Sequence, residues 1–168
     1  MPDKDDELAL ERAKEDEREG KSPSTQAGEF VREEIHHVRE GKHGARSPQQ
    51  AIAIGLSKAR RAGVELPAPA AGSAGEEVRT RAKRDLKKGR SGAKKTSAKR
   101  SRATSRALKR EGHTAASRQS LSRQGKKAAK KRGATARHRA AEKAVRTKGK
   151  TGLKQAAQKA ARTRRRAT

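Results

Sequence analysis

The chain of 168 residues contains no cysteine, tryptophan or tyrosine and only one phenylalanine, Phe30. Without cysteine, disulfides and thiolate metal sites are excluded. Proline is absent beyond Pro69. No apolar run approaches the roughly 20 residues of a membrane span, and none resembles a secretory signal. We therefore expect a cytoplasmic protein with no membrane partner.

Large apolar side chains are also scarce. The chain has 18 Leu, Ile, Val, Phe and Met residues beside 31 alanines, and nine of the 18 fall between positions 30 and 66. A chain with few apolar residues and a high net charge cannot bury enough apolar surface to offset the conformational entropy that folding removes. The predicted fold class is therefore mostly disordered with a small all-α element, a helical hairpin at about 24–66, followed by a conditionally helical basic tail.

Composition divides the chain further. Residues 1–23 are charged all round and predict an acidic disordered arm, which could fold back on the basic tail. Pro, Ala, Gly and Ser dominate the linker at 67–75. Residues 76–88 carry acids first and bases last, which suits a short charged helix. Residues 89–168 are a basic, low-complexity tail that should become helical only when phosphates neutralise its charges.

The hairpin is specified by an apolar stripe and by helix-ending residues. Ser24 or Thr25 is expected to cap a first helix, which Gly41 ends. The stripe of this helix is Ala27, Phe30, Val31, Ile35 and Val38. The isolated pair of helices leaves apolar edges exposed, which predicts a protein partner or self-association through 24–66.

The second helix has clear start and stop signals. Ser47 is placed as its cap and Pro48 at its first position. Gly55 permits close approach of the partner helix, and Gly63 suits a left-handed end. Its expected inward face is Ala51, Ile52, Leu56 and Ala59.

The segment SPQQAIAIGLSKARRAG, residues 47–63, resembles the signature of a small bacterial domain family of unknown function. Proteins with this QAIAIGLSKAR-type signature are usually described as DNA-binding or plasmid-stabilisation proteins. The resemblance covers about residues 28–66 and implies a bacterial source and a helical hairpin. The tail resembles lysine-rich bacterial histone-like proteins and linker-histone tails. It departs from them in lacking proline and in using 18 Arg beside 16 Lys.

Charge is strongly polarised along the chain. Residues 78–168 hold 34 Lys and Arg against three acids, a net charge of +31, whereas residues 1–40 have a net charge of −6. Such an excess calls for a polyanion, and nucleic acid is the commonest one. The near-absence of aromatic side chains disfavours base stacking, so duplex DNA fits better than RNA, which stays an alternative.

The densest basic clusters of the tail are the predicted DNA-binding residues. An alanine-rich motif at 140–147 recurs at 156–163, an offset of 16 residues, with a weaker copy at 128–130. No shared core accompanies the repeat, so it is interpreted as low complexity. The predicted contacts to phosphates are Lys126, Lys127, Lys130, Lys131, Arg132, Arg137, Arg139, Lys143, Arg146, Lys148, Lys150, Lys154, Lys159, Arg162, Arg164, Arg165 and Arg166.

Catalytic and metal-binding patterns are weak. His36 and His37 are adjacent and point about 100° apart on a helix, which suits one metal poorly. With His43 and the neighbouring Glu33, Glu34 and Glu40, they are interpreted as solvated helix surface. No phosphate-binding loop, dinucleotide fingerprint or nucleophile motif is present. We predict no enzyme activity, no metal and no cofactor.

The resulting prediction is a non-enzymatic, nucleoid-associated protein that binds DNA with little sequence preference. Two alternatives remain. One is a protein-interaction adaptor whose hairpin is the active part and whose tail localises it. The other is an RNA-binding or ribosome-associated basic protein.

Overall fold

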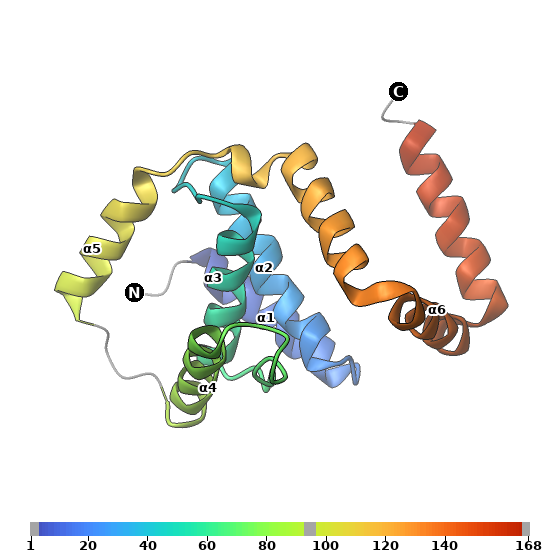
Figure 1. The fold of residues 1–168 in the computed structure, drawn as a ribbon, viewed down its shortest axis with the longest axis horizontal. Coiled ribbons are helices and arrows are strands. Elements are labelled where there is room, and N and C mark those ends of the chain that lie inside the picture. Colours follow the sequence, from blue (N-terminus) through green and yellow to red (C-terminus); the bar gives the residue numbers. More distant parts are fainter. Residues whose placement is uncertain (1–3, 93–96, 166–168) are drawn as a thin grey trace. The chain divides into compact units, whose positions relative to one another are not determined.

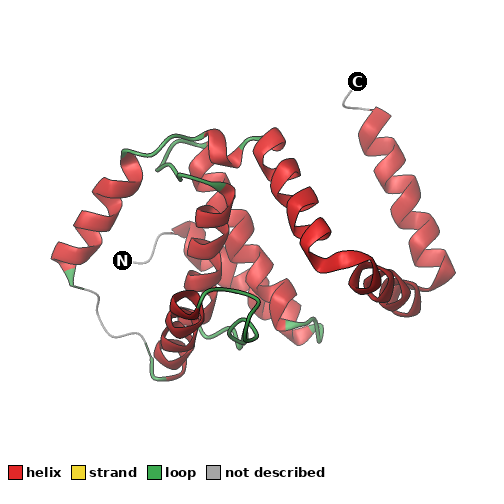
Figure 2. Cartoon of the chain, in the orientation of Figure 1, coloured by secondary structure: helices red, strands yellow, loops and turns green. Residues whose placement is uncertain are grey.

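The computed structural model of the protein describes residues 4–92 and 97–165 and is 78% helical. Its helices are α1 (Lys4–Arg18), α2 (Pro23–Arg39), α3 (Pro48–Arg61), α4 (Glu76–Arg90), α5 (Ala98–Lys109) and α6 (Arg118–Arg165), with a short 3-10 turn, η1 (Thr114–Ala116). Figure 2 shows helices joined by loops, with no strand in the described ranges. None of these helices is long and apolar enough to cross a membrane.

The prediction of a mostly disordered, intrinsically disordered chain is wrong. Helix extends over the acidic segment and over most of the basic tail. Two properties of these residues explain why the chain is helical and not disordered. Alanine, arginine, lysine and glutamine have the highest intrinsic helix propensities, and alanine can build close-packed helix contacts without large apolar side chains.

The chain forms two compact units, residues 1–122 and residues 123–168, which are described separately. The first unit is built around the hairpin of α2 and α3 (Figure 1). Gly55 of α3 faces the backbone of α2, where an added Cβ would lie 2.7 Å from the Cα of Val31. Only a residue without a side chain allows this approach.

The ends of the hairpin largely follow the predicted signals. Ser47 accepts a hydrogen bond from the amide of Gln50, and Pro48 is the first residue of α3. Gly41 and Gly63, with φ of 77° and 103°, follow the two helices in the left-handed region. The predicted cap of α2, Ser24 or Thr25, lies two or three residues too late, because Ser22 is the cap and Pro23 the first helical residue.

The predicted acidic disordered arm is instead α1, which packs on α2 (Figure 1). Ala9 and Ala13 are buried in one cluster with Phe30 and with residues of α3 and the following loop. Most acids of α1 lie on its exposed side, although Asp16 is buried, and two alanines are too weak a signal to predict a buried face. The cluster consists of Ala9, Ala13, Ala27, Phe30, Ala59 and Val64.

A second cluster lies at the other end of the hairpin. Here the loop after α2 meets the last turn of α5 and the segment after it, more than 60 residues away in sequence. Gly44 donates to the carbonyl of Leu108, and an added Cβ at Gly44 would lie 1.9 Å from the carbonyl oxygen of Glu111. The buried residues are Ile35, Val38, Ala45, Ala51, Ala115 and Ala116.

Helix α4 packs on α3 and buries Ala82. Ser57 of α3 donates to Asp85 at 2.6 Å. Arg90 pairs with Glu65 of the preceding loop, which lowers the pKa of that carboxyl. The hairpin edges that suggested a docking surface are therefore covered, in the described chain, by α1, α4 and η1.

Helix α6 interrupts its helical geometry twice. Gly133 (φ 74°, ψ 170°) and Gly149 (φ 63°, ψ 175°) are non-helical, so the element comprises three successive helical pieces, as Figure 1 shows. It contains no buried residue among those described. Near its start, Leu121 packs against the cluster of Ile35, Val38 and Ala116. The predicted conditional helix in this region is thus a helix that buries no residue of its own among those described.

Candidate nucleic-acid interface and a buried polar cluster

All the predicted DNA-binding residues within the described chain are exposed to solvent on α6. Sixteen of the seventeen fall in this range, and Arg166 lies outside the described residues. The helix carries 18 Lys and Arg and a single acid, Glu142, which pairs with His138. Because one carboxylate cannot offset 18 cations, the positive charge of α6 is almost uncompensated within the helix.

The breaks in α6 have the same spacing as the sequence repeat. Gly133 and Gly149 are 16 residues apart, and Ser117, another 16 residues earlier, has an extended backbone and caps α6 by accepting from the amide of Ser120. Each 16-residue period therefore begins with one non-helical residue. The repeat that was interpreted as low complexity coincides with a structural period.

This register places cations on a common helix face. Residues four and seven positions apart lie on one side of a helix. The first period has Arg123, Lys127 and Lys130 at this spacing, and all three are exposed. The sequence interpretation missed Arg123, because it chose residues by local density and not by helical register. The equivalent residues are Arg139, Lys143 and Arg146 in the second period, and Gln155, Lys159 and Arg162 in the third.

Side chains also support the helical pieces locally. The hydroxyls of Thr147 and Thr163, which are equivalent positions, donate to the carbonyls of Lys143 and Lys159 at 2.8 and 3.0 Å. Arg137 donates to the carbonyl of Gly133 at 3.2 Å. Equivalent contacts in successive periods indicate that the pieces share one local structure.

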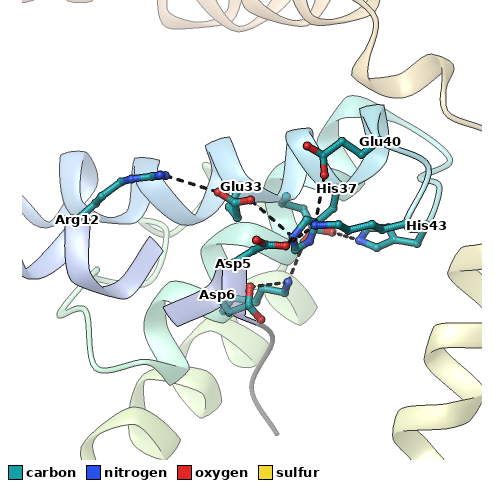
Figure 3. A network of polar contacts seen from close by, with 10 residues as sticks. Asp5, Asp6, Arg12, Glu33, His37, Glu40 and His43 are labelled. Atoms are coloured by element: carbon teal, nitrogen blue, oxygen red, sulfur yellow. Dashed lines mark hydrogen bonds and ion pairs between the residues drawn. The ribbon is translucent and has the colours of Figure 1, made fainter. Parts of the chain in front are cut away.

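A separate polar cluster lies where α1, α2 and the loop after α2 meet (Figure 3). His37 is 2% exposed, and its Nε2 lies 3.2 Å from Asp5 of α1 and 3.7 Å from Glu33. Glu34 is 1% exposed and lies 3.3 Å from Nε2 of His43. The interpretation of these residues as solvated surface is wrong for Glu34 and His37, and it holds for His36 and Glu40, which are exposed.

Lysines neutralise part of this cluster. Lys42 binds the carboxylate of Asp5, and this hydrogen bond is the main reason why the pKa of Asp5 is lowered. Lys58 lies 2.9 Å from Asp6 and 3.1 Å from Glu34. Burial lowers the pKa of Lys58, but these two carboxylates outweigh it and leave that pKa raised. The ion pairs attach the start of α1 to the hairpin.

The central part of the chain matches the model of a known protein family. Residues 20–70 match a family of unknown function (DUF6496). The match spans α2, α3 and the loop after them, which includes the segment 47–63 that resembles the signature of a small family of unknown function. No curated protein and no solved structure shows significant similarity to the chain.

Proposed function

We propose that the protein is a non-enzymatic, nucleoid-associated protein that binds duplex DNA through α6 with little sequence preference. The observation that carries this proposal is the repeated cationic face of α6, which is exposed in every period and has a single acid beside it within the helix. Binding of such a face to phosphates releases condensed counterions, which provides affinity without base readout.

The geometry of the helical pieces suits a duplex. A piece of 15 residues, such as 134–148, is about 22 Å long, and duplex DNA presents one charge per ~1.7 Å of its axis. Single non-helical glycines between the pieces let each one meet the phosphates separately. The described chain offers no exposed Phe, Tyr or Trp side chain for base stacking, since Phe30 is buried.

Two resemblances in the sequence support the same assignment. Proteins with the QAIAIGLSKAR-type signature are described as DNA-binding or plasmid-stabilisation proteins, and the tail is similar to histone-like tails. In this proposal the unit of residues 1–122 supplies a folded body, and α6 supplies the affinity and keeps the protein on the nucleoid.

The test neutralises one repeated lysine in each period. Lys127→Gln, Lys143→Gln and Lys159→Gln are combined in the full chain, and binding to two unrelated duplexes is measured by fluorescence anisotropy over a range of salt. Removing one phosphate contact should reduce the slope of log K against log salt by ~0.9, so the slope of the triple variant should fall by about 2 to 3. The two duplexes should respond equally.

The matched control removes the same charge from α4, by Lys83→Gln, Lys87→Gln and Lys88→Gln, at three exposed positions. It should retain most of the slope. Equal reductions for both triple variants would contradict the assignment to α6. Tighter binding to RNA of equal length would favour the ribosome-associated alternative, and absence of nucleic-acid binding would favour the adaptor.

A further inference from the structure

Glu34 is the least satisfied buried group of the first unit. Its side chain is fully buried, yet among the described residues neither carboxylate oxygen accepts a hydrogen bond. Lys58 approaches Oε2 at 3.1 Å as an ion pair, and Oε1 faces Nε2 of His43 at 3.3 Å without hydrogen-bond geometry. A buried carboxylate oxygen without a hydrogen-bond donor destabilises the folded state unless a cation binds it.

The ring of His43 is oriented toward the same place. Nδ1 of His43 lies 3.1 Å from the carbonyl oxygen of Gly44, which can only accept, so Nδ1 carries the proton. Nε2 then lies beside Oε1 of Glu34, where it can give its lone pair to a metal ion. Metal-binding histidines typically donate their other ring N–H to a carbonyl or carboxylate, which fixes the ring orientation in this way.

His37 completes the group. One ligand atom from each of Glu34, His37 and His43 lies within 4.8 Å of the others, and His37 packs edge-on against His43 with ring centroids 5.9 Å apart. In a tetrahedral zinc site, ligand atoms about 2.0–2.1 Å from the metal are roughly 3.3 Å from one another. The observed 3.3 Å between Glu34 and His43 has this separation.

We propose that Glu34, His37 and His43 bind a divalent transition-metal ion of the zinc class. Two imidazoles and one carboxylate are typical zinc ligands, whereas calcium and magnesium prefer oxygen ligands alone. Asp5 and Glu33, whose oxygens lie 3.2 and 3.7 Å from Nε2 of His37, form a second, separate group of potential ligands with His37.

The surrounding charges tolerate the ion. Lys58 holds only Oε2 of Glu34, which leaves Oε1 for the metal. Lys42 binds Asp5, whose side chain is 28% exposed. The ion would join α2 to the loop that carries His43. Through Gly44 and Ala45, the same loop is hydrogen-bonded to residues 108 and 112. The role of the ion is therefore structural, as a clamp on the second cluster.

The test uses the full chain without a histidine tag, after removal of metals with a chelator. Co²⁺ and then Zn²⁺ are titrated, and absorption of tetrahedral Co²⁺, calorimetric stoichiometry and the melting temperature are recorded. We expect one ion per chain, tetrahedral Co²⁺ bands that Zn²⁺ abolishes, and a melting temperature that rises with free Zn²⁺.

Two variants distinguish the buried site from surface histidines. His43→Gln, at a half-buried loop position, should weaken Zn²⁺ binding at least 100-fold while circular dichroism shows an intact fold. Glu34→Gln should act similarly. The control replaces His36, His113 and His138 together by glutamine, which leaves only His37 and His43, and it should bind as tightly as the parent. Absence of stoichiometric binding by the folded parent, or abolished binding in the control but not in His43→Gln, would overturn the proposal.

Discussion

Gly55 allows the backbones of α2 and α3 to approach closely. A methyl group there would lie 2.7 Å from the Cα of Val31 and 2.9 Å from the carbonyl oxygen of Phe30, and backbone atoms cannot rotate away. Gly55→Ala should therefore lower the free energy of unfolding by about 1–3 kcal/mol, the usual cost of overpacking. Chemical denaturation measures this value.

Gly28 provides the matched control for this substitution. It lies in α2 on an exposed face, and an added Cβ would meet nothing within 4 Å. Gly28→Ala should stabilise the protein by about 0.5–1 kcal/mol, because alanine loses less backbone entropy in a helix. The same substitution should thus change the free energy of unfolding in opposite directions at the two glycines. Equal effects at both would show that α2 and α3 do not approach as described.

The start of α3 gives a second prediction at the residue scale. Ser47 accepts from the amide of Gln50 at 3.2 Å, so Ser47→Ala should cost about 0.5–2 kcal/mol. Ser22 occupies the same position of α2 but makes no capping hydrogen bond. Ser22→Ala should change stability by a few tenths of a kcal/mol only. A larger destabilisation at Ser22 than at Ser47 would contradict these capping assignments.

At the scale of elements, α6 is divided by Gly133 and Gly149. Alanine rarely adopts a φ of +74° and favours the helix over glycine by about 0.8–1 kcal/mol. Gly133→Ala should therefore fuse the first two pieces into one continuous helix. Gly125 lies inside a helical piece, so Gly125→Ala should raise helicity without removing a break.

The absence of cysteine makes this fusion measurable. Spin labels on cysteines introduced at positions 127 and 143 have no competing thiol. In the fused helix the two labelled backbones should be about 24 Å apart along the axis, at 1.5 Å per residue. The Gly125→Ala control should keep the distance distribution of the parent. A Gly133→Ala distribution that equals the parent distribution would show that the break does not depend on glycine.

At the scale of the whole molecule, the acidic segment has a structural role within the first unit. α1 covers Phe30 with Ala9 and Ala13, and its Asp5 and Asp6 pair with Lys42 and Lys58. Removal of residues 1–20 should expose the first cluster and leave buried polar groups without partners. We expect the free energy of unfolding to fall by about 2–4 kcal/mol.

Thermal and chemical denaturation of the truncated protein tests this role. Removal of residues 150–168, a region without a buried residue in its described part, serves as the control and should leave the unfolding transition of the first unit unchanged. An unchanged transition after removal of residues 1–20 would show that α1 is a solvated arm after all.

Local sequence determined the hairpin and the polarity of charge. Ser47, Pro48, Gly41 and Gly63 are signals that act within one turn of helix, so they could be recognised without knowledge of contacts. The positive charge of residues 78–168 likewise follows from composition alone. The alanine-rich repeat was visible as well, although its meaning as a structural period depended on the breaks at Gly133 and Gly149.

Tertiary structure alone decided which weak signals became buried. Ala9, Ala13, Ala115 and Ala116 have no apolar periodicity strong enough to predict burial, yet close packing of helices makes small side chains sufficient. The polar cluster is of the same kind. Asp5, His37 and His43 are brought together only because α1 packs on α2 and the following loop turns back at Gly41, and spacing along the chain carries no trace of such contacts.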